Sequence, residues 1–386
     1  MPATPRCATR ASALALVLTL AALPAARADT VLVGPQHALK TPSAAAAVAH
    51  DGDVVEIEPG IYYGDAAIWT QNRLTIRARG GRAHLRADGA HAEGKAIWVI
   101  KGAKTTIENV EFSGARVADR NGAGIRLEGP GLTVRNGYFH DNESGILASS
   151  DLESDIVIEH SEFARNGAGG GASHNLYIGT VRTFTLRYSY SHHAIVGHNV
   201  KSRAIKNYIL YNRIADEQDG RASYAIDLPD GGLSFVIGNL IQQGPETDNR
   251  TIVAYGAEGY KNLLNELYFV SNTVVNDDPK GGRFLVIRQG ADAVRVINNL
   301  FAGPGELLTG KADARSNLRT TKADFVNPDK LDYRPKVRGA GVGKGIDAGN
   351  AYGFSLRPSE EYRHPLGNAP RPNSGPLDLG AHQHTQ

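Results

Sequence analysis

The chain has 386 residues, of which 42 are Lys or Arg and 40 are Asp or Glu, with a formal net charge of +2. This near balance gives no reason to expect a nucleic acid or a membrane surface as partner. Cys7 is the single cysteine. Disulfide frameworks and thiolate metal sites are therefore excluded, and the fold must be stabilised by packing.

The first 28 residues have the three parts of a secretory signal peptide. Arg6 and Arg10 give a basic start, residues 13–23 are apolar, and residues 26–28 form an A-x-A cleavage site. The apolar run is too short to span a bilayer. We therefore expect residues 1–28 to be removed and the mature protein, which then lacks Cys7, to be secreted or periplasmic.

An alanine-rich stretch opens the mature chain. Residues 43–50 are predicted to form a short helix that ends at Asp51-Gly52, and residues 54–58 then begin the strands. A terminal unit of a repeat protein must cover its open end. The helix is therefore expected to cap one end of a stack of repeats.

The middle of the chain is periodic, with a short pattern of an apolar residue, any residue and usually Asn. It recurs at residues 107–109, 134–136, 210–212, 237–239, 270–272 and 297–299. A second short apolar strand precedes each pattern, at 97–100, 125–128, 146–149, 176–179, 200–203, 226–229, 252–255 and 284–287. Alternation with period 2 indicates strands. Stacked units of this kind predict a parallel β-solenoid in which the repeated Asn side chains form a ladder.

The predicted fold class is all-β. Residues 29–302 are expected to form one right-handed parallel β-helix with the short capping helix at its N-terminal end. From about Gly303 the period fades into sequence rich in Gly, Pro and Asn. We expect residues 303–386 to be a loop-rich extension that packs on the β-helix rather than a separate domain.

Strand register predicts which side chains point outward. If the first and third residues of each leading strand face the core, the second and fourth face solvent. The second positions are Trp98, Arg126, Leu147, Tyr177, Lys201, Asp227, Val253 and Leu285, and the fourth include Glu128, Arg203 and Tyr255. Neighbouring coils lie about 4.8 Å apart. Tyr177, Lys201 and Asp227 should therefore form one outward column, with Arg203 on the same face.

A second repeat lies just ahead of these strands. The sequence reads Ser-His-Asn at 173–175 and Gly-His-Asn at 197–199, so His174 and His198 should stack on successive coils. Tyr224 and Arg250 are expected at the equivalent places further on. A solenoid aligns equivalent positions on one face, and the gathering of titratable groups there favours a functional site. Taken singly, these histidines and charges also fit turn chemistry or solvated surface charges.

One segment consists of residues 198–203, His-Asn-Val-Lys-Ser-Arg, with Asn207 and Asn212 after them. It resembles the Lys-Ser motif of the alginate lyase and chondroitinase B group. These are polysaccharide lyases of the pectate-lyase-like β-helix superfamily. The resemblance implies that Lys201 is the catalytic base that removes the C5 proton of a uronic acid. The group also carries an arginine on the following coil, where this chain reads Ile-Asp-Leu-Pro-Asp-Gly at 226–231. Residues 224–230 are loosely similar to the Asp-Pro-His-Asp region of mannuronan C5-epimerases.

Beta-elimination from a uronide needs a cation near the carboxylate, a base for the C5 proton and an acid for the leaving O4. Arg203, with Arg250 or Arg126, would neutralise the carboxylate by bidentate contacts. Lys201, His198 or Tyr177 would act as the base, and a lysine must be deprotonated first. The predicted catalytic residues are Lys201, His198, Tyr177, Arg203 and Asp227, and the predicted substrate-binding residues are His174, Asn175, Asn199, Tyr224, Arg250, Arg126 and Tyr255.

The expected function is thus cleavage of an acidic polysaccharide by a secreted, monomeric lyase. Alternatives on the same fold are a C5-epimerase and a glycoside hydrolase with Asp227 and Asp230 as its carboxylates. A non-catalytic carbohydrate-binding solenoid would instead use tyrosines such as Tyr177, Tyr224 and Tyr255. No cofactor and no metal site are predicted, but calcium at the acidic loop of Asp216, Glu217 and Asp219 is left open. The sequence also leaves open whether the histidines bind a metal or the sugar.

Overall fold

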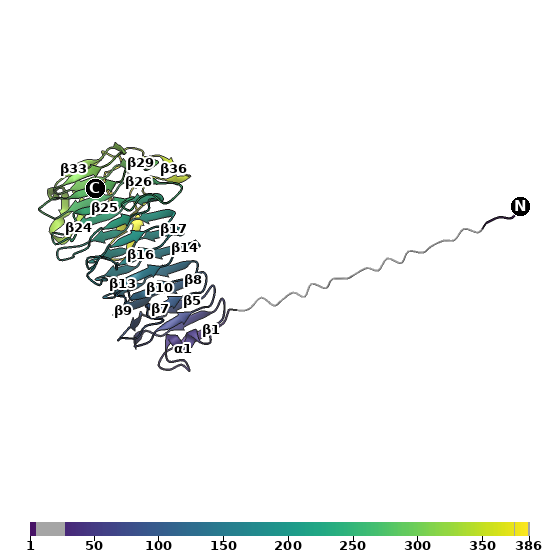
Figure 1. Cartoon of the computed structure of the whole chain (residues 1–386). Helices are drawn as coiled ribbons and strands as arrows, with labels where there is room; N and C mark the ends of the chain where they lie inside the picture. Colours follow the sequence, from purple (N-terminus) through teal and green to yellow (C-terminus); the bar gives the residue numbers. More distant parts are fainter. Residues whose placement is uncertain (5–27, 374, 385–386) are drawn as a thin grey trace.

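The computed structural model describes residues 1–4, 28–373 and 375–384. The signal peptide predicted for residues 1–28 lies almost wholly outside the described residues. Figure 1 shows an elongated stack of strands that runs from α1 and β1 at one end to β33 at the other. Within the described part of the chain, no helix has the length and apolar character needed to cross a bilayer.

Three long sheets form the walls of the stack, and every pairing within them is parallel. Sheet A contains β1 (Thr30–Val33), β2 (Val54–Ile57), β5 (Thr75–Ala78), β8 (Thr105–Glu108), β11 (Leu132–Arg135), β14 (Asp151–Glu159), β17 (Val181–Arg187), β20 (Lys206–Leu210), β23 (Leu233–Ile237), β26 (Glu266–Val270), β29 (Ala293–Ile297) and β32 (Asp313–Arg315). Sheet B contains β3 (Gly60–Tyr63), β6 (Ala83–Arg86), β9 (Val110–Ser113), β12 (Tyr138–His140), β15 (Glu162–Ala164), β18 (Tyr190–His192), β21 (Arg213–Ala215), β24 (Leu240–Gln243), β27 (Thr273–Asn276), β30 (Leu300–Ala302) and β33 (Leu318–Thr320). Sheet C contains β4 (Ala67–Trp69), β7 (Ala96–Ile100), β10 (Ala123–Leu127), β13 (Ser144–Ala148), β16 (Leu176–Ile178), β19 (Val200–Ser202), β22 (Ile226–Leu228), β25 (Thr251–Tyr255), β28 (Arg283–Ile287) and β31 (Glu306–Thr309).

Each coil therefore contributes one strand to sheet A, then one to sheet B, then one to sheet C. The predicted parallel β-helix is confirmed. The short sheet B strands carry a row of phenylalanines, one on each of three successive coils. Phe112, Phe139 and Phe163 are fully buried and stack with ring centroids 5.0 and 4.9 Å apart. This stack fills the centre of the N-terminal half.

The register prediction is wrong by one residue in three strands of sheet C. Trp98 pairs with Ile125, and Val253 pairs with Ile226 and Leu285, so Trp98, Val253 and Leu285 face the core. All three are buried. These strands are apolar on both faces, so alternation of polar and apolar residues does not fix their phase.

The asparagine ladder is confirmed in the C-terminal half. Each amide Nδ2 donates to the Oδ1 of the next coil, at 3.0, 3.0, 3.1 and 2.9 Å, along Asn212, Asn239, Asn272, Asn299 and Asn317. Asn109 and Asn136 were wrongly assigned to this ladder. Arg135 lies in the same row of sheet A as Leu210. Asn136 is therefore in the row of Tyr211, one residue before the row of Asn212. These two amides bond only to each other along this row, at 2.8 Å.

The N-terminal end is closed by α1 (Pro42–Ala46), which is shorter than the predicted 43–50. The hydroxyl of Thr41 caps the helix by accepting a hydrogen bond from the amide of Ala44. The helix packs against β1 and β4, and Figure 1 shows it at the end of the stack. An end that exposed open strands would pair with other chains, so this cap protects the fold.

The C-terminal extension begins after one further coil. β31, β32 and β33 add a strand to each sheet, so the stack continues through Thr320, beyond residue 302. Short elements follow: η1 (Lys322–Asp324), β34 (Phe325–Asn327), η2 (Pro328–Lys330), β35 (Asp332–Pro335), β36 (Asn350–Ala351), β37 (Phe354–Ser355), β38 (Glu360–Arg363) and β39 (Gly367–Pro370). Phe354 packs on Phe235 of sheet A, and Phe325 belongs to an apolar cluster with Leu240 of sheet B. The extension thus lies along the outside of sheets A and B.

Candidate functional site

Sheet C carries the predicted outward column. Tyr177 of β16 pairs with Lys201 of β19, and Lys201 pairs with Asp227 of β22. The flanking residues Leu176, Val200 and Ile226 are fully buried and set the phase of these three-residue strands. Arg203 follows immediately after β19. The pairing confirms the prediction that Tyr177, Lys201 and Asp227 share one face. Arg203 joins this face through its hydrogen bond to Tyr177.

The two stacked histidines are held in one tautomer. The backbone N–H of His198 donates to Nδ1 of His174 at 3.0 Å, and that of Tyr224 donates to Nδ1 of His198 at 3.4 Å. Their ring centroids lie 4.5 Å apart. An Nδ1 that accepts a hydrogen bond leaves the ring proton on Nε2. Burial, with the positive charge of Lys201, lowers the pKa of His198 to about 3, so this imidazole is neutral at ordinary pH.

Asp227 lies at the centre of the cluster. Its Oδ2 is 3.4 Å from His198 Nε2 and 3.5 Å from Lys201 Nζ. Its Oδ1 is buried and has no hydrogen-bond partner among the described residues. Burial raises the pKa of Asp227 to about 6, against the opposing effect of Lys201. A buried carboxyl group that titrates near neutrality is a frequent mark of a functional site.

A carboxylate from a distant loop bridges the two cations. Oε1 of Glu258 is 3.0 Å from Lys201 Nζ, and Oε2 is 2.7 Å from Arg203 Nη2. Burial opposes ionisation of Glu258, but the hydrogen bonds from Arg203 and Lys201 hold its pKa below the usual value. Arg203 also donates from Nε to the phenol oxygen of Tyr177 at 2.9 Å and from Nη1 to Asp230 at 2.6 Å.

Glu258 and Lys261 were missed by the sequence reasoning. Both follow β25 in a loop that hydrogen-bonds to the preceding coil, from the Glu258 amide to Pro229 and from the Lys261 amide to Asp230. Lys261 Nζ reaches Asp230 Oδ1 at 2.9 Å. The loop breaks the repeat, so no periodic signal marks these residues. Only the long-range contact with Lys201 and Arg203 reveals Glu258.

A family model described as "Right handed beta helix region" matches residues 60–305. The chain belongs to this family. Among solved structures, the pectate lyase Pel9A superimposes with a TM-score of 0.64 at 14% identity, over 93% of this chain and 97% of that one. An alginate lyase from Paenibacillus sp. str. FPU-7 gives 0.47 at 14% identity, over 74% and 97%, and the PL6 family alginate lyase AlyGC gives 0.34 at 13%, over 90% and 56%. A sequence comparison with curated proteins gives no match. The likeness to Pel9A shows a shared fold.

Within this β-helix, Tyr255 does not face the site. It pairs with Leu228 and is fully buried, and its phenol donates to the carbonyl oxygen of Gly232 at 2.6 Å. Its predicted outward position is therefore wrong, for the same reason as that of Val253. A fully buried side chain whose hydroxyl is already bonded inside the protein has no surface to offer a polysaccharide.

Asn175 and Asn199 belong to a second ladder inside the β-helix. Their side chains are fully buried, and Asn175 Nδ2 donates to Asn199 Oδ1 at 3.0 Å. The ladder begins at Asn142 and Asn166 and ends on the carboxylate of Asp216. The predicted substrate-binding role of these two asparagines is wrong because their amides close the turn between sheets B and C.

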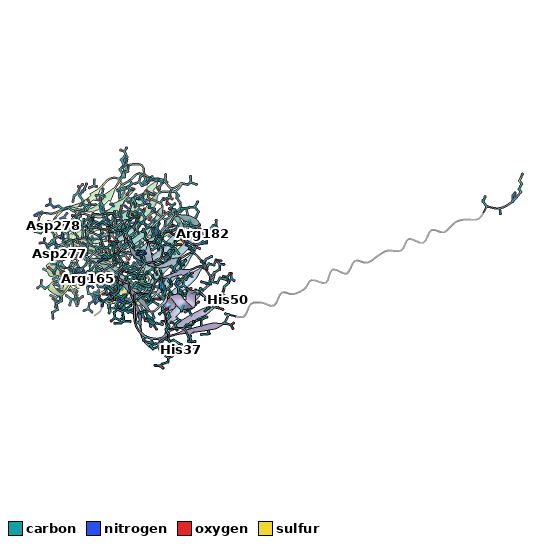
Figure 2. All side chains as sticks on the ribbon, turned by 60° about the horizontal axis from the view of Figure 1, so that its bottom comes forward. His37, His50, Arg165, Arg182, Asp277 and Asp278 are labelled. Atoms are coloured by element: carbon teal, nitrogen blue, oxygen red, sulfur yellow. The ribbon has the colours of Figure 1, made fainter. Side chains whose placement is uncertain are left out.

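The two outlying arginines have different positions. Arg250 is not at the position equivalent to Tyr224 but one residue before it, because Val253 pairs with Ile226. The Nε of Arg250 is 3.2 Å from the carboxylate of Asp278, which is labelled in Figure 2. Arg126 points outward as predicted, in the same row as Leu147 and Tyr177. The outward row of sheet C therefore continues from Tyr177 to Arg126, while Arg250 pairs with Asp278.

The acidic loop after β21 does not gather its three carboxylates. Asp216 accepts from Asn199, and burial raises its pKa to about 7. Glu217 is paired with Arg213 through two hydrogen bonds of 3.0 and 2.9 Å. Asp219 is exposed and lies 3.0 Å from His193. Each carboxylate therefore has its own partners.

The raised pKa of Asp227 gives a stability prediction. The folded carboxyl binds its proton more tightly than the unfolded one, whose pKa is near 3.8. Ionisation of this buried carboxyl lowers the free energy of unfolding. The decrease is therefore absent below about pH 4 and reaches its full size above about pH 6. At about 1.4 kcal/mol per pKa unit, Asp227→Asn should raise the free energy of unfolding by about 1–3 kcal/mol at pH 8.

Urea denaturation at several pH values measures this difference. The gap between Asp227→Asn and the unsubstituted protein should grow between pH 4 and pH 7. Asp219→Asn, at an exposed carboxylate, should show no such trend. A gap that stays constant over this range would contradict the burial argument.

Proposed function

We propose that this β-helix is a secreted polysaccharide lyase that cleaves a uronate-containing polysaccharide by β-elimination at the sheet C cluster. The observation that supports it most is the Glu258 carboxylate held between Lys201 Nζ at 3.0 Å and Arg203 Nη2 at 2.7 Å. A uronic acid presents the same chemical group. The fold is that of polysaccharide lyases such as Pel9A, which adds support at the level of architecture.

Arg203 would bind the substrate carboxylate in place of Glu258. Its guanidinium is fixed by Tyr177 on one side and Asp230 on the other. A planar guanidinium makes two parallel hydrogen bonds to a carboxylate, which lysine does not. Neutralising that carboxylate stabilises the negative charge that develops when C5 loses its proton.

Lys201 is the favoured base. Displacement of Glu258 by substrate would remove one of the two carboxylates that stabilise its ammonium form, and Asp227 Oδ2, 3.5 Å away, would be placed to take up the proton. His198 is a poor base because its Nδ1 accepts a backbone hydrogen bond and its Nε2 carries the proton directed at Asp227. We assign His198 and Asp227 to positioning Lys201.

Tyr177 is the favoured acid. Its phenol oxygen accepts from Arg203 Nε, so its own proton is available to the leaving group. In the proposed step Lys201 takes the C5 proton, the C5 electron pair forms the C4–C5 double bond, the C4–O4 bond breaks, and Tyr177 protonates O4. Charge and atoms balance without a metal, and we propose no cofactor.

Absorbance near 235 nm tests the proposal, because elimination creates unsaturated uronide ends. The purified mature protein would be incubated with alginate, pectate, glucuronan and glycosaminoglycans. A rise on any of these supports a lyase. New reducing ends without a rise would indicate a hydrolase, exchange of the C5 hydrogen with deuterated solvent alone an epimerase, and binding alone a carbohydrate-binding solenoid.

Export and assembly are tested separately. We propose that residues 1–28 direct secretion and that the mature protein acts as a monomer on its acidic polysaccharide. N-terminal sequencing of the exported protein should start near Asp29, and light scattering should give the mass of one mature chain. An exported protein that retains residues 1–28 would contradict the cleavage site.

Glu258 should compete with the substrate carboxylate. Glu258→Gln keeps the size of the side chain but removes its charge, so substrate no longer has to break two ion pairs. For two partly exposed pairs that together contribute about 1 kcal/mol or less, we expect KM to fall by up to about fivefold while kcat stays within about twofold. Initial rates on the active polysaccharide measure both constants.

Glu246→Gln is the control, because Glu246 is an exposed acid in the preceding loop. This substitution should change neither KM nor kcat. An unchanged KM in Glu258→Gln would argue against competition between Glu258 and the substrate carboxylate.

A further inference from the structure

A group of three potential metal ligands lies on the outside of sheet B, away from the sheet C cluster. His84 of β6 pairs in register with Glu111 of β9, and His140 of β12 lies on the next coil. All three side chains are partly buried, with exposures of 20%, 20% and 15%. Three successive coils thus direct two imidazoles and one carboxylate at one point.

The spacing of the ligand atoms matches a tetrahedral metal site. Glu111 Oε1 lies 3.4 Å from His84 Nδ1 and 3.0 Å from His140 Nε2. One ligand atom from each residue lies within 4.8 Å of the others. Zinc–nitrogen and zinc–oxygen bonds of about 2.0–2.2 Å place neighbouring tetrahedral ligands roughly 3.3 Å apart. Glu111 Oε1 therefore already lies near this distance from both imidazole nitrogens, which are within 4.8 Å of each other.

The surroundings orient the ligands as metal sites require. His140 Nδ1 is 2.6 Å from the Asp141 carboxylate, which Arg165 holds through hydrogen bonds of 3.0 Å from both Nε and Nη2. Arg165 is labelled in Figure 2. His84 Nε2 is 2.7 Å from the hydroxyl of Ser113. Metal-binding histidines usually bond their second ring nitrogen in this way.

We propose that His84, Glu111 and His140 bind a divalent first-row transition metal, with Zn²⁺ as the best-matched ion. Two nitrogens and one carboxylate oxygen are borderline ligands that suit Zn²⁺ better than Ca²⁺ or Mg²⁺. The partial exposure leaves a fourth position for water. The ion would join three coils of a chain that has no disulfide in its mature part, and would stabilise the N-terminal half.

Metal binding to the full mature protein tests the proposal. After removal of metals with a chelator, calorimetric titration with Zn²⁺ should show one site per chain with micromolar or tighter affinity. Co²⁺ in its place should give the visible absorption of a tetrahedral ion. His84→Ala, His140→Ala and Glu111→Gln should each weaken Zn²⁺ binding at least 100-fold, and Asp141→Asn about 10- to 100-fold.

His192→Ala is the matched control. His192 also contacts a glutamate on sheet B, Glu162, at 3.2 Å, but this pair is not joined by a third converging ligand in the described residues. Its substitution should leave Zn²⁺ affinity unchanged. Zn²⁺ should raise the Tm of the unsubstituted protein and of His192→Ala, but not of Glu111→Gln.

Two results would overturn the site. One is the absence of stoichiometric binding to the unsubstituted protein. The other is binding that persists in Glu111→Gln, whose near-identical shape should preserve the fold. Elimination activity at 235 nm is independent of this test, because none of the substituted residues belongs to the sheet C cluster.

Discussion

Lys201→Ala is expected to lower kcat on the active polysaccharide by about 10²- to 10⁴-fold, the usual contribution of a positioned base. The substitution removes the Nζ that lies between Asp227 and Glu258. Neither neighbour can replace it, because Asp227 is buried and Glu258 is displaced by substrate in the proposed step. The initial rate of increase at 235 nm measures the loss.

Lys206→Ala is the matched control, since Lys206 is an exposed lysine five residues later, on β20 of sheet A. It should keep full activity. Circular dichroism should show both variants folded, because neither lysine belongs to the apolar core. If Lys201→Ala retained more than about a tenth of the rate, the base would have to be another group, and Tyr177→Phe would be the next variant to measure.

Asn239→Leu is expected to lower the free energy of unfolding by at least about 3 kcal/mol. Asn239 Oδ1 accepts from both the backbone and the side chain of Asn212, and its Nδ2 donates to Asn272 and to the carbonyl oxygen of Ile209. Leucine fills a similar volume but leaves these buried groups without partners, at about 1–3 kcal/mol for each. Urea denaturation at neutral pH measures the effect.

The end of the same ladder provides the comparison. Asn317 accepts from Asn299 and donates to the carbonyl oxygen of Val296, but it is only partly buried. Water can therefore replace some of the hydrogen bonds that Asn317→Leu removes. The decrease in the free energy of unfolding should be clearly smaller than for Asn239→Leu. Equal losses at the two positions would contradict the argument that burial sets the cost of the lost hydrogen bonds.

The position of the sheet C cluster follows from the rest of the fold. The C-terminal extension covers the outer sides of sheets A and B through Phe354 and Phe325. Its apolar contacts, within the described residues, include none from sheet C. The outward row from Arg126 through Tyr177 to Asp227 therefore lies on the side that the extension leaves uncovered, which suits binding of a long polymer.

The sequence by itself determined the architecture, because the repeating coils of a solenoid require similar residues at regular intervals along the chain. Equivalent positions on successive coils predict three features: the repeated strands, the ladder from Asn212 to Asn299, and the column of Tyr177, Lys201 and Asp227. Each depends on contacts between neighbouring repeats, which recur at a fixed spacing and so leave a pattern that can be recognised without coordinates.

The tertiary structure decided what periodicity does not encode. The phase of Trp98 and Val253 depends on core packing, because strands that are apolar on both faces show no alternation. Glu258 reaches Lys201 across 57 residues through a loop that interrupts the repeat. His84 and Glu111 lie in one row of sheet B, but His140 reaches Glu111 diagonally from the next coil, outside that row. These contacts are set by the paths of particular side chains and loops, and only the folded chain brings them together.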